Sequence, residues 1–160
     1  MSRATPPRQN GFNPHQPGVD YGVLDALLGY AVRRAQIRIT QAFDARLSDA
    51  GMTTQRFSAL VLIARNPGRK QAELAAIMGI ARSGALAIVE SLDAQGLVER
   101  RPSPDDGRAQ ALYLTALGER SLPGITAAVV AHDRDIAVSL SHDEAALLKS
   151  LLEKIAAPGS

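Results

Sequence analysis

Hydrophobic residues recur at helical spacing over most of the chain. Across residues 19–48 they fall on one broad arc at about 100° per residue, which predicts one long amphipathic helix ended by Gly51. Three shorter helical stretches follow at 53–66, 70–78 and 81–95, and brief turns containing glycine separate them. Three helices joined this closely are typical of a helix-turn-helix.

The period of the pattern changes after the third of these helices. Residues 97–101 and 109–115 read as two short strands, and the segment 102–108 between them is rich in Pro, Asp and Gly. Such a segment predicts a turn that folds the two strands into a β-hairpin. We therefore predict a mainly α fold with a small β-hairpin wing, which is a winged helix-turn-helix on a helical stalk.

Two more helices are predicted after the hairpin. The first extends to about Leu140, and Pro123-Gly124 near its start should kink or restart it. The second opens at Ser141, and Glu144 three residues later forms a capping box with it. The chain therefore ends, as it begins, in helical structure outside the winged lobe.

The chain divides into an arm, a lobe and a flanking helical region. Residues 1–18 carry four Pro and almost no aliphatic side chain, which predicts a flexible N-terminal arm. The alternative is an arm that orders against a partner subunit, with Phe12 as its anchor. Residues 53–115 form the winged lobe. The apolar faces of 19–52 and 116–160 are too extensive for one small lobe to cover, so we expect them to form a dimerisation region.

Composition narrows the classes of function. The 160 residues contain no Cys, which excludes disulfides, thiolate zinc sites and cysteine nucleophiles. The net charge is only +2, so nucleic-acid binding must be argued from where the charges lie. Neither a secretory signal nor a run near the ~20 apolar residues of a membrane span is visible, so we expect a cytoplasmic protein without membrane contact.

We do not expect an enzyme. His15, His132 and His142 have no partners at metal-ligand spacing, so neither a metal nor a cofactor is predicted. The run from His132 to Asp135 lacks the companion motifs of a kinase catalytic loop and should form a solvated helix face. The sequence also has neither a glycine-rich phosphate loop nor a nucleophile elbow.

Several segments resemble the MarR family of bacterial regulators. They are Gln71–Ile80, Val89–Pro102, Pro104–Arg108 and Ala111–Thr115, within a layout that is similar over residues 20–156. The resemblance implies a homodimer with one winged helix per subunit, each meeting a major groove of a pseudo-palindromic double-stranded DNA operator. It also implies a repressor that a small anionic aromatic effector releases from DNA. The alternatives are a ligand-independent regulator or activator, and a winged-helix protein-interaction module.

The resemblance makes the last of the three lobe helices the recognition helix. Its first residues, Arg82 and Ser83, should meet base edges or phosphates. Residues 84–88 are small or apolar where many relatives are polar. We therefore expect few direct base contacts from this helix, and more of the sequence specificity to come from the wing and from DNA shape. Lys70 and Gln71, at the start of the preceding helix, are candidate phosphate contacts.

The wing carries the other predicted DNA contacts. Gly107 permits a tight hairpin tip, Arg108 can enter the minor groove, and Asp106, by family analogy, can hold that guanidinium in place. Of Arg100 and Arg101 on the first strand, one should face phosphate and the other solvent. Over the lobe eight Lys and Arg stand against six Asp and Glu, a local charge of +2, so binding should be moderately sensitive to salt.

Arg34 and Arg38 indicate an effector site. By helical angle they lie together at the edge of the apolar arc, and like charges at this spacing repel unless an anion lies between them. They either clamp a carboxylate or phosphate, pair with acidic side chains of the other subunit, or reach into solvent. Segment 29–36 is similar to the MarR branch that senses hydroxycinnamoyl-coenzyme A thioesters, which implies an apolar acyl pocket near Met52 and Phe57.

Overall fold

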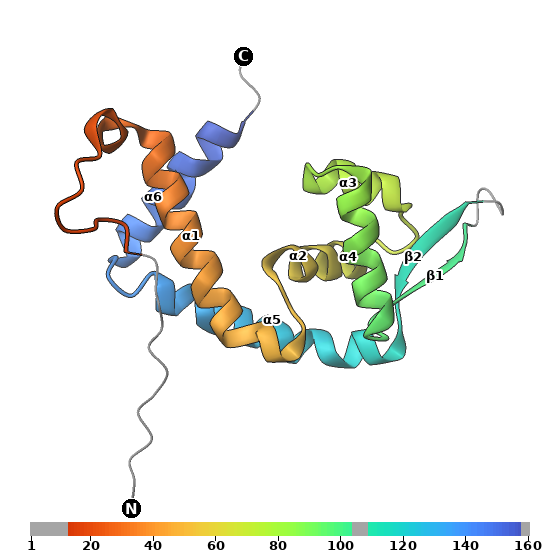
Figure 1. The fold of residues 1–160 in the computed structure, drawn as a ribbon. Helices are drawn as coiled ribbons and strands as arrows, with labels where there is room; N and C mark the ends of the chain where they lie inside the picture. The colour runs from red at the N-terminus through yellow and green to blue at the C-terminus, as the bar shows by residue number, and fades with distance from the viewer. Residues whose placement is uncertain (1–12, 104–108, 158–160) are drawn as a thin grey trace, which may run out of the picture.

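The structure, a computed structural model, describes residues 13–103 and 109–157. A helical stalk and a lobe with the hairpin lie at opposite ends of the long helix α5 (Figure 1). In chain order the elements are η1 (Gly22–Ala26), α1 (Leu28–Leu47), η2 (Ser48–Ala50), α2 (Thr54–Arg65), α3 (Gln71–Met78), α4 (Arg82–Ala94), β1 (Val98–Pro102), β2 (Gln110–Leu114), α5 (Ala116–Ile136) and α6 (His142–Ala156), where η denotes a 3₁₀ helix. The predicted fold class, mainly α with one antiparallel hairpin, is confirmed.

The prediction of a single helix over 19–48 is wrong at its N-terminal end. Asp20 accepts a hydrogen bond from the backbone N–H of Gly22 at 2.8 Å, and Gly22 has a positive φ of 52°. This local turn competes with helical hydrogen bonding, so only the short helix η1 forms there. At Leu27 the backbone is extended (φ −92°, ψ 121°), and α1 begins at the next residue. Gly51 ends the segment as predicted, in a left-handed conformation after η2.

α5 is one continuous helix that contains Pro123. The predicted restart at Pro123-Gly124 is therefore wrong. A proline removes one backbone N–H, and the carbonyl that loses its partner is that of Glu119, an exposed residue at which water can replace the bond. The helix ends at Ile136, before the predicted end at about Leu140, and a short turn leads to α6.

The helices α2, α3 and α4 and the hairpin surround one hydrophobic core. Its largest fully buried side chains are Met52, Leu60, Ile63, Leu92, Leu112, Val89 and Val98. β1 pairs antiparallel with β2, with Arg100 opposite Leu112. The chain before α3 adds to the other edge of β2, where Leu112 bonds to Gly68 and Arg69 at N···O distances of 3.0 and 2.9 Å. These backbone bonds tie the wing to the helices of the lobe.

The start of α5 lies very close to the base of the wing. A Cβ on Gly118 would stand 2.1 Å from the carbonyl oxygen of Leu97, which is far inside contact distance. Thr115 caps the helix, since its Oγ1 accepts a hydrogen bond from the N–H of Gly118 at 3.0 Å. Glycine therefore lets the first turn of α5 pack against the backbone of the lobe.

The stalk leaves a large apolar surface uncovered. No described residue of α6 is buried in this single chain. The exposed apolar side chains of α6 are Leu147, Leu148, Leu151, Leu152 and Ile155, and those before and at the start of α1 are Val19, Val23, Leu24, Leu27 and Leu28. A soluble monomer rarely exposes so many large apolar side chains together. A surface of this kind is typical of a protein–protein interface.

Candidate nucleic-acid interface and ligand cavity

α4 presents a mixed polar and apolar face to solvent. Its exposed residues include Arg82, Ser83, Leu86, Ala87 and Glu90, whereas Ala85, Ile88, Val89 and Leu92 are buried. Part of the apolar run 84–88 is therefore explained by packing, because Ala85 and Ile88 hold α4 in the lobe. The exposed face still offers a cation, a hydroxyl and a carboxylate around a small apolar centre.

Lys70 and Gln71 lie at the N-terminus of α3, as predicted. The backbone N–H of Lys70 donates to Oε2 of Glu73 at 2.8 Å, and Nη1 of Arg69 lies 2.9 Å from Oε1 of the same carboxylate. The backbone hydrogen bond, followed by the Arg69 contact, holds the pKa of Glu73 below its ordinary value. Within the described chain neither Lys70 nor Arg82 forms an ion pair, so both charges are available to an anion.

Carboxylates of the same chain hold both arginines of β1. Nη1 of Arg100 lies 2.9 Å from Oδ2 of Asp93 on α4, and the arginine side chain is 28% exposed. Nε of Arg101 lies 2.9 Å from Oε1 of Glu99, and its guanidinium stands 4.9 Å from the centroid of the Tyr113 ring. Arg101 is 55% exposed and is thus the better placed of the two to reach a phosphate.

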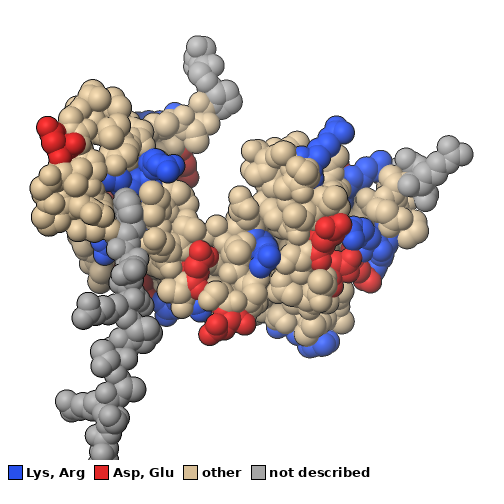
Figure 2. All heavy atoms as spheres, viewed as in Figure 1, with Lys and Arg blue, Asp and Glu red and all other residues tan. Residues whose placement is uncertain are grey.

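Asp106 and Arg108 lie outside the described residues, so their roles stay predictions. At the base of the wing, Lys and Arg side chains gather on the lobe, and acidic side chains lie between them (Figure 2). The ion pairs of Arg69, Arg100 and Arg101 bring these opposite charges together. The lobe surface is therefore mixed in charge rather than uniformly basic.

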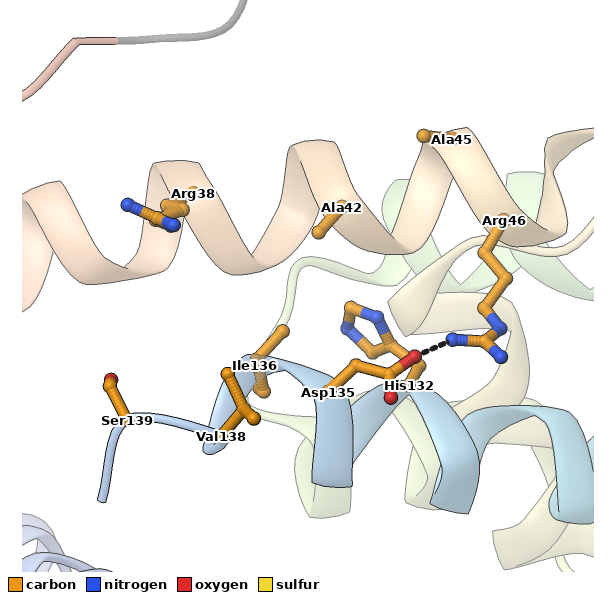
Figure 3. Close-up of a pocket in the computed structure, with 9 residues that line it drawn as sticks. All are labelled: Arg38, Ala42, Ala45, Arg46, His132, Asp135, Ile136, Val138 and Ser139. Atoms are coloured by element: carbon orange, nitrogen blue, oxygen red, sulfur yellow. Dashed lines mark hydrogen bonds and ion pairs between the residues drawn. The ribbon is translucent and has the colours of Figure 1, made fainter.

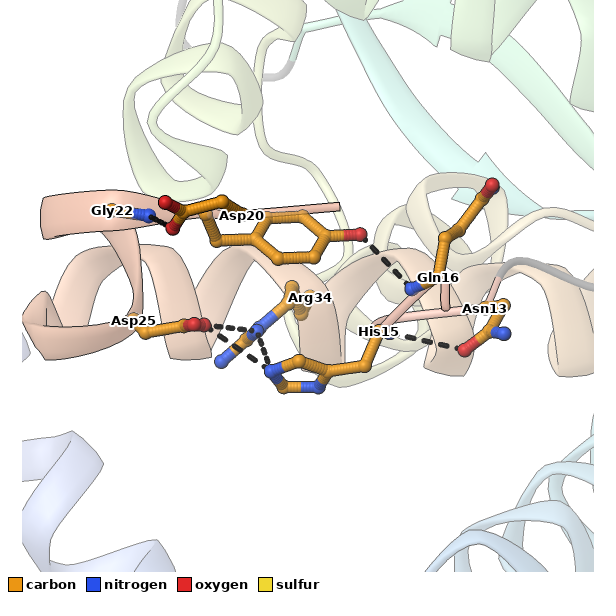
Figure 4. A network of polar contacts seen from close by, with 8 residues as sticks. Asn13, His15, Gln16, Asp20, Gly22, Asp25 and Arg34 are labelled. Carbon is orange, nitrogen blue, oxygen red and sulfur yellow. Dashed lines mark hydrogen bonds and ion pairs between the residues drawn. The ribbon is translucent and has the colours of Figure 1, made fainter. Parts of the chain in front are cut away.

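Arg34 is paired within its own chain. Its Nη1 lies 3.1 Å from Oδ1 of Asp25 and 3.1 Å from Nε2 of His15 (Figure 4). The guanidinium also stands 4.9 Å from the centroid of the Tyr30 ring, and His15 packs edge-on against Tyr21. The chain itself thus supplies an anion beside Arg34, and the described end of the N-terminal arm lies against α1.

A cavity of about 710 Å³ lies between α1 and the C-terminal end of α5 (Figure 3). Its lining residues are Arg38, Ala42, Ala45, Arg46, His132, Asp135, Ile136, Val138 and Ser139. Arg46 of α1 and Asp135 of α5 form an ion pair that links the two helices. Arg38 forms no ion pair with any described residue. The cavity therefore combines small and apolar walls with a cation that an anionic ligand can reach.

His132 is buried, at 4% exposure, so the prediction of a solvated helix face is wrong for this residue. Its ring packs edge-on against Phe43, with 5.3 Å between ring centroids. No group of the described chain forms a hydrogen bond with its Nε2 atom. The spacing of Ile125, Val129 and His132 along α5 could have revealed this position, because it puts the histidine on the face that packs against the core.

Met52 and Phe57 do not line this cavity. Met52 is 1% exposed inside the lobe core, and Phe57 is partly buried against that core. Of the four residues predicted to bind an effector, Arg38 lies at the cavity and Arg34 is held by Asp25. The predicted acyl pocket near Met52 and Phe57 stays a prediction.

The described chain offers neither a metal cluster nor a single membrane-spanning helix. Over residues 13–103 and 109–157, no group of three or more His, Asp or Glu side chains could hold a metal ion. In the same residues no single helix is long and apolar enough to cross a membrane. α3 and α4 reach such a composition only together, as a pair bent by 113°.

Both the sequence and the fold have known counterparts. The profile described as the MarR family matches residues 50–109. A transcriptional regulatory protein for the hcr operon of Thauera aromatica is 34% identical over 136 residues, which are 84% of this chain and 82% of that protein. The transcriptional repressor CouR bound to a 23-mer DNA duplex is 36% identical with a TM-score of 0.81, over 87% of this chain and 99% of that one. CouR bound to p-coumaroyl-CoA is 34% identical with a TM-score of 0.80, over 88% and 99% of the two chains.

Proposed function

Because the chain belongs to the MarR family of winged-helix transcriptional regulators, we propose that it is a homodimeric repressor that a small anionic aromatic effector releases from its operator. Its relatives regulate transcription and are not enzymes. The observation that carries the proposal is the exposed start of α4, where Arg82 has no ion pair within the described chain and the wing lies alongside. Such a repressor acts on chromosomal DNA, and in a bacterium this places it in the cytoplasm.

The proposed DNA contacts come from three parts of the lobe. The start of α4 enters the major groove, where Arg82 grips a guanine edge or a phosphate and Ser83 donates to a phosphate. Lys70 and Gln71 meet phosphates at the N-terminus of α3, where the helix dipole favours an anion. In the wing, Arg108 enters the minor groove with Asp106 beside it, and Arg101 follows the backbone.

The dimer rests on the uncovered apolar surface of the stalk. α6 exposes five large apolar side chains, and the segment before α1 adds more. A second copy of the chain offers a matching surface about a two-fold axis, and dimers of this symmetry are the commonest soluble oligomers. Two lobes then face DNA together, which suits a pseudo-palindromic operator.

The effector site rests on the cavity between α1 and α5. Its small and apolar walls suit an aromatic group, and Arg38 offers a cation to a carboxylate or phosphate. Since CouR binds p-coumaroyl-CoA, we take an aromatic acyl-coenzyme A thioester as the first candidate. Arg34 joins such a site only when an anionic ligand displaces Asp25 from it. The effector releases DNA to the extent that it binds the DNA-free geometry more tightly.

Fluorescence anisotropy on a duplex from upstream of its own gene, or one selected from random sequences, tests the repressor. We expect Arg82→Ala to lower operator affinity about tenfold or more, since a bidentate base contact contributes about 1–3 kcal/mol. Arg134→Ala removes an exposed cation from the far end of α5 and should leave affinity unchanged. Equal affinity for operator and unrelated DNA in the wild-type protein would instead favour a protein-interaction module.

The same complex, titrated with p-coumaroyl-CoA, tests the effector site. We expect the thioester to release the wild-type protein and Arg38→Ala to need more thioester at unchanged operator affinity. Arg33→Ala is the matched control, because Arg33 is exposed on the same helix and does not line the cavity. Normal release from Arg38→Ala would remove this arginine from the site.

A further inference from the structure

His132 is a buried polar group without a partner in the described chain. Leaving a buried nitrogen without a hydrogen bond is destabilising, and most buried polar atoms in proteins have a hydrogen-bond partner. This nitrogen lies on a residue that lines the cavity between α1 and α5, and not in the closed core of the lobe. Nε2 itself is buried, so a ligand in the cavity reaches this unsatisfied group when a neighbouring side chain moves aside.

The surroundings of His132 define what it can bind. The residue is 4% exposed, and its ring is held edge-on by Phe43. Burying an ion beside this ring without a counter-charge is costly, so a neutral hydrogen-bonding partner suits the site better than an ion. The charged groups of the cavity, Arg38, Arg46 and Asp135, are exposed and lie nearer to solvent. The cavity thus has an inner end suited to a neutral polar group and an outer end suited to an anion.

We propose that His132 is a specificity-determining residue, whose Nε2 accepts a hydrogen bond from the ring hydroxyl of a phenolic effector. The inference rests on the proposed effector site and names the ligand chemistry that this site selects. The aromatic ring of the ligand lies between the small side chains of Ala42 and Ala45 and the apolar wall of Ile136 and Val138. Its anionic portion extends to Arg38.

A pair of ligands that differ only in the hydroxyl tests this role. p-Coumaroyl-CoA carries the ring hydroxyl and cinnamoyl-CoA lacks it. We expect the wild-type dimer to bind p-coumaroyl-CoA at least about tenfold more tightly, because the analogue leaves the imidazole unpaired. In His132→Phe the ratio should fall close to one. In His142→Phe, which changes an exposed histidine on α6, the ratio should stay as in the wild type. An unchanged ratio in His132→Phe overturns the proposal.

The stability of the ligand-free protein provides a second readout. Replacing an unsatisfied buried imidazole with an apolar ring should raise the Tm, whereas replacing a hydrogen-bonded one should lower it. A lower Tm for both His132→Phe and the smaller His132→Leu would mean that the nitrogen is already paired in the dimer, and would overturn the proposal. Failure of both thioesters to bind, with operator binding intact, would remove the effector class and this inference while the repressor stands.

Discussion

At the scale of single residues, Leu86 is the unusual side chain on the surface of α4. It is 41% exposed on the same face as Arg82 and Ser83, with Ala87 beside it. An exposed leucine gains nothing from water, but in a major groove it can pack against the C5-methyl group of a thymine. We therefore expect thymine to be preferred at the operator position that Leu86 meets.

Replacing that thymine with deoxyuridine removes only the methyl group and tests this contact. The wild-type protein should lose affinity for the uracil-containing operator, while Leu86→Ala should bind both duplexes equally and more weakly than the wild type binds thymine. Anisotropy titrations of the two proteins on the two duplexes form a double-mutant cycle, which gives the interaction energy between Leu86 and the thymine methyl group. Ala94→Ser, on an exposed position at the other end of α4, provides the control. Equal losses in Leu86→Ala and the wild type would place Leu86 away from the base.

The partners of Arg34 and the burial of His132 were not predicted from the sequence. The helical angle put Arg34 and Arg38 at one edge of α1, but it could not reveal that Asp25 and His15 would reach Arg34. Those contacts depend on the break at Leu27, which turns the preceding segment back toward α1. For His132, the helical spacing was visible in the sequence, yet the charged neighbours of the histidine favoured an exposed face.

At the scale of elements, α6 has no buried residue in one chain, so its N-terminal cap is a local source of its stability. Oγ of Ser141 accepts the N–H of Glu144 at 3.2 Å, and Oε2 of Glu144 accepts the N–H of Ser141 at 2.8 Å. The predicted capping box is confirmed. The two hydrogen bonds with Ser141 lower the pKa of Glu144, the backbone N–H contributing most.

This shift predicts an acid-sensitive end of the stalk. A carboxyl whose pKa is lowered in the folded chain adds stability above its unfolded pKa, near 4.5, and loses it as the pH falls through the folded pKa. We expect Glu144→Gln to lower the Tm at pH 7 and to match the wild type at pH 3. Asp143→Asn leaves the capping box intact and is the control. A constant difference between Glu144→Gln and wild type across this range would contradict the prediction.

The elements themselves were largely predictable because their signals are local. Glycine turns, the hairpin segment and the capping box lie within a few residues of the boundaries that they set. The two errors have local causes as well. The hydrogen bond from Gly22 to the Asp20 side chain forms a turn where the apolar pattern predicted a helix. Pro123 is accommodated inside α5 because the backbone carbonyl that loses its partner belongs to the exposed residue Glu119.

At the scale of the whole molecule, the apolar surface of α6 should decide whether the protein dimerises. Leu151→Glu places a charge on this surface and should give a monomer that binds operator DNA much more weakly, since one lobe loses the second half-site. Sedimentation velocity and anisotropy measure the two effects. Ser150→Glu puts the same charge outside the apolar face of α6, about 100° around the helix from Leu151, and should stay dimeric. A dimeric Leu151→Glu would show that another surface joins the subunits.

The continuity of α5 through Pro123 has a mechanical consequence. The helix has 21 residues and runs from the base of the wing to the wall of the cavity. It is a lever about 30 Å long, so a tilt of about 5° at one end displaces the other by about 3 Å. At Gly118 the first turn of the helix packs directly against the backbone of the lobe, and at Pro123 the helix lacks one backbone N–H donor. A ligand that enters beside His132 and tilts α5 slightly would therefore change the distance between the two lobes of a dimer.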